Sequence, residues 1–327
     1  MDQLALANKP SVCSSIPIYR GFVVYCGSHP PEKSHARDWM QSSFFKFSST
    51  VYPISRGWAV QSSLDCKMHL LLTDETNQRP GRDARFFILG GLVVPFDSID
   101  ALHTRIETAR KGAGYREQDE LKFETNARPN QVSVQQATEA KRQVIAAAQE
   151  LGCKFIAHVI HHEIIRNQDL EQQVQWAADY VIGRFNYYLN TINDTGICAV
   201  DNLPVRAQFR YLSDKFSLGL SLPDGNRVRL DRIRLLSATC ANASHLSSAM
   251  DIVLGAFRYC LNNPRNQDAA SEMMKSVVEL MWHEKRGDEI LAVGKGLIVR
   301  PEMENIRNQE YRKDYDELFD HINRLLG

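Results

Sequence analysis

The sequence predicts an α/β protein in which a mixed β-sheet is flanked by helices on both faces. From residue 68 onward, short apolar runs bounded by turn residues alternate with segments of helical periodicity. The runs at 68–73 and 86–94 are apolar at successive positions, as in strands that are buried on both faces. The segment 174–192 has the cleanest helical stripe, so it must pack on a broad apolar surface.

Turn residues and helix caps separate the elements in the first half of this stretch. A turn at 80–83 divides the two buried strands. A helix then runs from an N-cap near Ser98 to the glycines at 112–114, with apolar residues on one stripe. A second helix is expected at 134–151, followed by a strand at 154–165.

The second half continues the alternation. Residues 197–200 form a further short apolar run that reads as a buried strand. A turn at 223–225 predicts a hairpin between strands at 216–222 and 227–237. Beyond the hairpin we expect helices at 246–261, 269–283 and 305–325, and a short strand at 296–299.

Residues 1–67 show neither strand nor helix periodicity and are rich in serine and proline. We therefore expect a poorly patterned N-terminal extension at 1–67 and one domain at 68–327 that ends in a helix. The longest apolar run, 86–96, is interrupted by glycine and proline and is shorter than the roughly 20 residues that span a bilayer. No secretory signal is recognised in the first thirty residues, so a cytoplasmic protein without membrane contact is expected.

Charge and cysteine content narrow the function classes. Thirty-nine basic residues balance 39 acidic ones, so any site for a polyanion must be local. The arginines at 227, 229, 232 and 234 are one candidate, but Asp231 shifts the alternation, so the two pairs would face opposite sides of one strand. A solvated ribbon edge is the favoured interpretation, and phosphate contact is the alternative. The seven cysteines have no zinc-type spacing and read as reduced thiols.

Carboxylates follow two of the buried strands. Asp74 comes directly after the strand at 69–73, and Asp201 directly after the strand at 197–200. Taken singly, such an aspartate is more often a helix cap or a turn residue. In sheets of this kind, however, chemistry collects at the carboxyl ends of strands, so the pair is a stronger signal than either member.

Further acids supply partners for this pair. Asp251 lies in a predicted helix on a stripe with Ser247, Gly255 and Arg258, distinct from the apolar face. Gly255 suggests that another backbone or a substrate approaches the helix closely, because glycine inside a helix costs about 1 kcal/mol. Glu120 is a fourth acid, with Lys122 two residues on. Clustered carboxylates need a compensating cation, and hard divalent ions prefer oxygen ligands.

Histidines and serines are weaker candidates. His158, His161 and His162 lie in a predicted strand where the first and last would share a face, but no third metal ligand is near in sequence. Structural roles are favoured for all three. Packing at a helix start is likewise favoured for His245 over contact with a substrate. Ser247 has no base at fixed spacing, so a hydrolase triad is not supported.

The residues above resemble the family known as domain of unknown function 3800, a divergent branch of the ribonuclease-H-like superfamily, over 68–301. The matching motifs are Asp-Glu-Thr-Asn at 74–77, Leu-Gly-Gly at 89–91, Glu-Leu-Lys at 120–122, Asp201, and Ser-Ala-Met-Asp at 248–251 with Gly-Ala at 255–256. Asn77 replaces a glycine and Ser248 replaces a glutamine of the family pattern. Every acid of the pattern is kept, which favours an active metal site over a decayed one.

The resemblance and the acids together predict a divalent-metal-dependent nuclease of ribonuclease-H-like fold that acts on RNA or DNA. Asp74, Glu120, Asp201 and Asp251 would ligate Mg2+ or Mn2+ and act in catalysis. Glu75 would either be an additional ligand or contact the ligands without binding the metal, and Lys122 would neutralise charge on a phosphate. The alternative is an inactive ribonuclease-H-like binding or regulatory protein that uses an acidic cleft for a partner or a structural ion.

Overall fold

A computed structural model describes the chain from residue 66 to residue 326 with gaps. The described ranges are 66–76, 84–202, 208–221, 227–240, 243–262, 267–286 and 289–326. The predicted extension 1–67 lies outside these ranges except for its last two residues, and so do the predicted turns at 80–83 and 223–225. Within the described ranges no helix is both long and apolar enough to span a bilayer.

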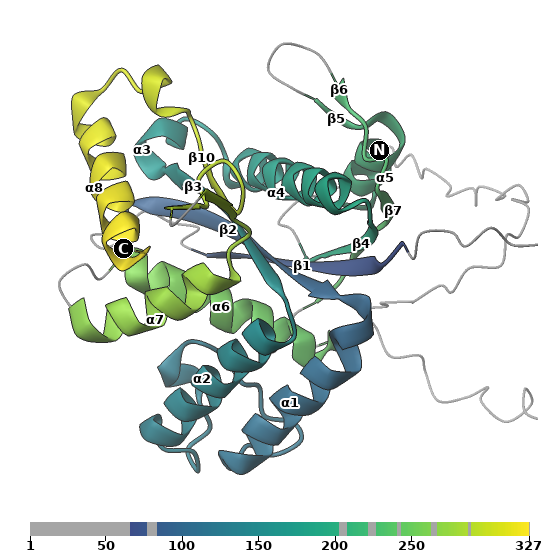
Figure 1. The fold of residues 1–327 in the computed structure, drawn as a ribbon, viewed down its shortest axis with the longest axis vertical. Coiled ribbons are helices and arrows are strands. Elements are labelled where there is room, and N and C mark those ends of the chain that lie inside the picture. Colours follow the sequence, from purple (N-terminus) through teal and green to yellow (C-terminus); the bar gives the residue numbers. More distant parts are fainter. Residues whose placement is uncertain are drawn as a thin grey trace, which may run out of the picture. The chain divides into compact units, whose positions relative to one another are not determined.

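A six-stranded mixed sheet forms the centre of the domain (Figure 1). Its strands are β1 (Met68–Thr76), β2 (Phe86–Pro95), β3 (Lys154–His161), β4 (Thr195–Val200), β7 (Ile233–Ala238) and β10 (Leu297–Val299), in the order β10-β3-β2-β1-β4-β7. β2 is antiparallel to both neighbours, whereas β4 is parallel to β1 and to β7. Three antiparallel strands in sequence, followed by parallel strands added beside the first, make the ribonuclease-H-like arrangement.

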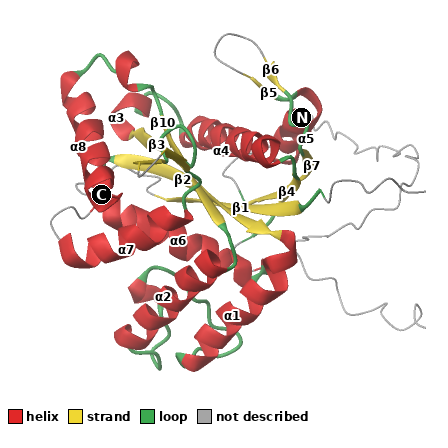
Figure 2. Cartoon of the chain, in the orientation of Figure 1, coloured by secondary structure: helices red, strands yellow, loops and turns green. Residues whose placement is uncertain are grey.

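Helices cover both faces of this sheet, as Figure 2 shows. One face carries α1 (Ile99–Gly112), α2 (Val134–Glu150), α6 (His245–Asn262), α7 (Gln267–Leu280) and α8 (Gln309–Leu326). The other carries α4 (Leu170–Ile192) with the shorter α3 (His162–Ile165) and α5 (Gln208–Leu218). Single 3-10 turns are found at Phe96–Ser98, Thr125–Ala127 and Met303–Asn305. The predicted fold class is therefore confirmed.

The strands are apolar at successive positions because each face of the sheet has its own core. On β1, Leu72 belongs to the core under α6, and Leu71 belongs to the core under α4. Both are buried, as expected for side chains that alternate across a strand. The predicted stripe of α4 is buried as far as Tyr188, but Ile192 at its end is 39% exposed.

The predicted strand at 154–165 is too long. β3 ends at His161, and the next four residues form α3. The His161 ring accepts the backbone N–H of Glu163 at 3.2 Å and so begins the helix. His162 is therefore helical and does not share an extended face with His158. All three histidines are buried, and none belongs to a group of potential metal ligands in the described chain.

The predicted hairpin is correct in place but wrong in extent. Residues 208–218 form the helix α5, which takes the start of the predicted strand at 216–222, and only β5 (Leu220–Ser221) pairs with β6 (Arg227–Val228). The predicted strand at 227–237 is two strands, since β7 leaves the hairpin and joins the main sheet beside β4. A second small hairpin, β8 (Glu284–Arg286) with β9 (Glu289–Leu291), was not predicted.

His158 is buried without a hydrogen bond. Its ring is 1% exposed and stacks on Tyr180 at 4.9 Å between centroids, and neither ring nitrogen has a hydrogen-bond partner. Burial, and secondarily the Arg300 charge, lower the pKa of His158 to about 3. The unfolded chain therefore binds a proton that the folded protein excludes between about pH 6.5 and pH 3.

A prediction about acid stability follows. Stability that depends on neutral His158 is fully present above pH 6.5 and declines as the pH falls toward 3. Replacing the ring by one that cannot titrate, as in His158→Phe, is expected to reduce the difference in unfolding free energy between pH 7.5 and pH 5.0, measured by urea denaturation. The unfolding free energies at the two pH values are measured on the same variant, so any cost of repacking around the phenylalanine cancels in their difference. An undiminished difference would contradict the expectation.

Candidate active site

Two neighbouring parallel strands bring the predicted aspartates together. β1 pairs with β4 so that Leu72 lies opposite Ala199, and the residues that follow reach the same edge of the sheet. One carboxylate oxygen each from Asp74, Glu75 and Asp201 lie within 4.8 Å of one another. These three residues are hereafter the acidic triad, and their spacing suits shared ligation of one cation.

Two members of the acidic triad, Asp74 and Asp201, line a pocket of about 250 Å³. Its lining residues are Leu72, Thr73, Asp74, Glu120, Leu121, Lys122, Asp201, Thr239, Ser247, Ser248, Met250 and Asp251. The structure therefore gathers Asp74, Glu120, Asp201, Asp251 and Lys122 around one space. In the described chain, the carboxylates of Glu120 and Asp251 are not part of the triad's oxygen group.

The pocket concentrates negative charge at Asp74. Burial is the largest cause that raises the pKa of Asp74 from 3.8 to about 7, and the nearby charges of Asp251, Glu75 and Asp201 contribute to the same rise in that order. The backbone N–H of Glu75 opposes this shift by donating to Asp74 Oδ1 at 2.9 Å. Like charges held this close are costly unless a cation compensates them. With an all-oxygen donor set, the residues present fit Mg2+ or Mn2+.

Lys122 is the positive charge within this pocket lining. Its Nζ lies 2.8 Å from Glu120 Oε2, and this bond is the main cause that raises the pKa of Lys122. The carboxylates of Asp251 and Asp74 raise it further. Lys122 therefore stays protonated and faces the acids. Glu120 engages Lys122 instead of the acidic triad in this arrangement.

Asp251 holds the segment that carries Glu120 and Lys122. Asp251 Oδ2 accepts the backbone N–H of Phe123 at 2.6 Å. Lys141 of α2 donates to the Phe123 carbonyl at 2.6 Å, which secures the same residue from the other side. Burial raises the pKa of Asp251, and the Phe123 N–H and the nearby cations oppose the rise. The polar stripe predicted on α6 is thus the surface on which this segment docks.

Gly255 is the place where another chain segment approaches α6. A Cβ at this position would lie 2.6 Å from Phe123 Cδ1 and closer still to Phe123 Cγ and Cβ. One turn further along, Arg258 lies 3.6 Å from Glu124. The sequence left two approaches open, another backbone or a substrate, whereas the structure places the side chain of Phe123 there.

Gly255→Ala is expected to displace Phe123 and destabilise the protein. Forcing a methyl group into a packed contact typically costs about 1–3 kcal/mol. The matched control is Gly112→Ala at the end of α1, where a Cβ would meet no atom within 4 Å. The control should be neutral or stabilising by roughly 0.5–1 kcal/mol. Urea denaturation measures the unfolding free energy of both variants. Equal changes would show that the Phe123 contact does not determine the cost of the substitution at Gly255.

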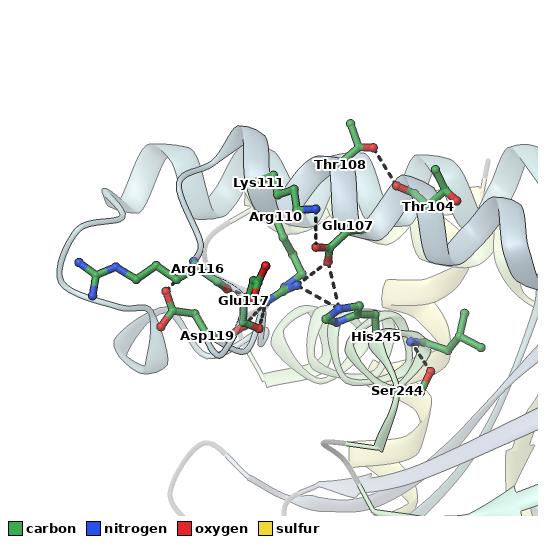
Figure 3. A network of polar contacts seen from close by, with 11 residues as sticks. Thr104, Glu107, Thr108, Arg110, Lys111, Arg116, Glu117, Asp119, Ser244 and His245 are labelled. Atoms are coloured by element: carbon green, nitrogen blue, oxygen red, sulfur yellow. Dashed lines mark hydrogen bonds and ion pairs between the residues drawn. The ribbon is translucent and has the colours of Figure 1, made fainter.

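A buried arginine, which the sequence reasoning missed, anchors the start of the same segment (Figure 3). Arg110 is 2% exposed. Its Nη2 donates to the carbonyls of Arg116 at 3.1 Å and Glu117 at 3.3 Å, and also to that of Asp119. Its Nη1 donates to Glu107 at 2.6 Å. The sequence does indicate this burial, because Arg110 lies four residues after Ile106 and therefore on the buried stripe of α1.

His245 joins this network from the N-terminal end of α6. Its Nε2 lies 3.0 Å from Glu107 Oε2 and 3.2 Å from Arg110 Nη1. Burial and the Arg110 charge lower the pKa of His245, and Glu107 acts in the opposite direction. Arg110 therefore ties together α1, the segment before Glu120, and the helix that carries Asp251. The predicted packing role of His245 agrees with these contacts.

Strand order and pocket together define the class of this protein: a ribonuclease-H-like α/β protein with an acidic pocket at its strand ends. No protein-family model matches the chain, and no curated protein sequence matches it. The chain is similar to the crystal structure of Bst-RNase HIII in complex with Mn2+, with 12% identity and a TM-score of 0.35 over 64% of this chain and 62% of that chain. The chain thus matches less than two thirds of that neighbour's length.

A mutant of the same Bst-RNase HIII is a second neighbour, with 13% identity and a TM-score of 0.34 over 71% of this chain and 70% of that chain. At these scores neither likeness supports a conclusion about chemistry. The fold assignment rests on the order and directions of the strands.

Proposed function

We propose that this protein is a divalent-metal-dependent nuclease that hydrolyses phosphodiester bonds in RNA or DNA. The observation that carries the proposal is the acidic triad of Asp74, Glu75 and Asp201, whose oxygens lie within 4.8 Å beside a pocket that also holds Lys122. The raised pKa of Asp74 supports it, because burial and the like charges of Asp251, Glu75 and Asp201 favour a bound cation at this place.

Each residue then has a stated role. Asp74, Glu75 and Asp201 would hold Mg2+ or Mn2+, which when bound polarises a phosphodiester and activates water. Glu120 and Asp251 line the same pocket and are proposed as further ligands. Lys122 would bind a phosphate oxygen and offset its charge. Asp251 also keeps Lys122 in place through the Phe123 backbone.

Membership of the domain of unknown function 3800 family is part of the same proposal. The motif acids Asp74, Glu120, Asp201 and Asp251 are spread over more than 170 residues of sequence, yet all line one pocket. The Leu-Gly-Gly motif lies opposite them, since Gly90 pairs with Asp74 and Gly91 with Thr73 in the β1–β2 ladder. That these motif residues lie together supports the proposal that they form one functional site of the family and do not match its pattern by chance.

The direct test incubates purified protein with labelled single-stranded and duplex RNA and DNA, with Mn2+, with Mg2+ and with EDTA. Metal-dependent cleavage that EDTA removes is expected. Binding of metal or nucleic acid without any cleavage would instead favour the inactive binding or regulatory protein. Metal binding itself is read independently by titration calorimetry with Mn2+, which does not depend on the substrate chosen.

We also propose that the functional domain spans 68–327 and that 1–67 is an extension. Expression from Met68 should yield folded protein, as judged by circular dichroism. The backbone N–H of Lys67 donates to Asp194 at 2.9 Å, and its carbonyl accepts from Thr195 at 3.1 Å. A version that begins at Cys66 keeps both bonds. If both versions are unfolded, the earlier residues belong to the domain.

A further inference from the structure

α5, β6 and β7 lie near one another at the β7 edge of the sheet (Figure 1), and their exposed surface is hereafter called the strip. α5 begins beside the pocket, because the Gln208 side chain donates to the backbone carbonyl of Asp201 at 3.2 Å. β7 ends there, because the next residue, Thr239, lines the pocket and donates its N–H to the Val200 carbonyl at 2.8 Å. Both elements therefore connect the candidate site to more distant surface.

This strip carries positive charge that no carboxylate of the described residues pairs with. Arg227, Arg229 and Arg234 are exposed, and no described carboxylate forms an ion pair with any of them. The bonds of Arg229 to the Ser217 carbonyl at 3.1 Å and of Arg234 to the Asp231 carbonyl at 2.8 Å leave the positive charges in place. The segments 208–221 and 227–240 hold six basic and two acidic side chains in a chain of zero net charge.

The expected arrangement of these arginines on opposite sides of one strand is wrong. Arg227 belongs to β6, Arg229 follows it, and Arg234 belongs to β7. Arg232 has a separate structural role, since it donates to Asn190 at 2.9 Å and to Asn193 at 2.8 Å beyond the end of α4. Three arginines remain available on the surface for a ligand.

Exposed aromatic rings lie on the same strip. Phe209 is 79% exposed and Phe216 is 48% exposed. They are seven residues apart on α5, which places them on one side of the helix and roughly 10 Å apart along its axis. Phe209 directly follows Gln208, the residue that contacts Asp201. Phe209 therefore lies at the end of α5 that contacts Asp201, and Phe216 lies at the other end, where Arg229 bonds to the Ser217 carbonyl.

We propose that α5, β6 and β7 form a binding surface for single-stranded nucleic acid, one phosphate of which enters the acidic pocket. Guanidinium groups would bind the phosphates, and the phenylalanine rings would stack on unpaired bases. A duplex fits less well, because its bases stack on each other and leave no free face for these rings. The assignment of the entering phosphate rests on the proposed nuclease function, whereas the binding surface itself does not require cleavage.

Two variants separate the two kinds of contact. One combines Arg227→Gln, Arg229→Gln and Arg234→Gln, and the other combines Phe209→Ser and Phe216→Ser. Affinity for labelled single-stranded RNA and DNA is measured by fluorescence anisotropy in EDTA, over a series of salt concentrations, so that no cleavage occurs. The control combines Arg105→Gln, Arg142→Gln and Arg166→Gln, which are exposed but ion-paired arginines on or near other helices.

The arginine variant is expected to lose at least tenfold in affinity at low salt. Its slope of log affinity against log salt should become shallower by about 2, because each phosphate contact on a single strand contributes about 0.7. The phenylalanine variant should also lose at least tenfold but keep the parent's slope, because stacking releases no counterions. The control variant should bind as the parent does, and melting curves by circular dichroism verify that all three are folded.

Several results would overturn the binding surface. These are unchanged single-strand affinity in both variants, tighter binding of duplex that is insensitive to the phenylalanine changes, or binding only to phosphatidylserine vesicles. If the variants lose binding and the parent does not cleave, the binding surface is supported and the proposed nuclease function is contradicted. Cleavage by the parent with an unchanged KM in both variants supports the nuclease and contradicts the surface.

Discussion

Asp74→Asn is expected to abolish metal-dependent cleavage, with a loss of at least about 10²-fold. Asp74 lies in the acidic triad, and Asn offers a neutral oxygen where a charged ligand is needed. The electrostatic contribution of a bound ion is several kcal/mol, and each 1.36 kcal/mol is tenfold in rate. Initial rates on labelled RNA and DNA with Mn2+ measure the effect. Cleavage at the parent's rate would contradict the nuclease proposal.

The same substitution is expected to stabilise the metal-free protein. The raised pKa of Asp74, from 3.8 to about 7, means that the folded protein holds a proton that the unfolded chain has released. The stability from this proton is fully present below about pH 4 and is lost as the pH rises through 7. Asn cannot ionise, so in EDTA the variant should melt higher than the parent at pH 8, by at least about 2 °C, and by less at pH 5.

Asp316→Asn is the matched control, because Asp316 is an exposed aspartate of α8. It should change neither cleavage nor the melting temperature in EDTA. The opposite signs expected for Asp74→Asn, lower activity with higher stability, distinguish a strained ligand cluster from simple misfolding. A variant that loses activity and stability together would show that Asp74 is a structural residue.

Arg110→Met is expected to produce the largest loss of stability, about 3–5 kcal/mol. Removing one partner of a buried charge network leaves the others uncompensated. Here Glu107 would lose its 2.6 Å bond, and the three carbonyls that Arg110 caps, those of Arg116, Glu117 and Asp119, would lose their buried donor. The melting temperature measured by calorimetry should fall by roughly 10 °C, since 1 kcal/mol corresponds to about 2–4 °C in a domain of this size.

Arg105→Met is the control on the same helix. Arg105 is 57% exposed and lies 3.0 Å from Glu150, so its ion pair should contribute at most about 1 kcal/mol. Equal destabilisation by the two substitutions would contradict the role assigned to Arg110. Arg110 also holds the segment before Glu120. Mn2+ affinity, measured by calorimetry at a temperature where both variants are folded, should therefore fall in Arg110→Met and remain unchanged in Arg105→Met.

Much of the fold could be predicted because its signals are local. Apolar runs bounded by turn residues predicted β1, β2 and β4, and 3.6-residue periodicity predicted α1, α2, α4 and α6. The errors are in short elements. α3 and the β8–β9 hairpin are too short to show a period, and the end of α5 was assigned to the predicted strand at 216–222. The switch of β7 from the hairpin into the main sheet depends on pairing with β4.

What the sequence determined by itself was the edge of the sheet where chemistry collects, since Asp74 and Asp201 each follow a buried strand. Only the tertiary structure decided how the remaining groups combine: Glu75 joins the two aspartates, Glu120 pairs with Lys122, and Asp251 binds the Phe123 backbone. The physical reason is the distance along the sequence over which the interactions act. A strand and its terminal carboxylate are encoded within ten residues, whereas the segment with Glu120 takes its place through Arg110 and through α6, more than 120 residues away in sequence.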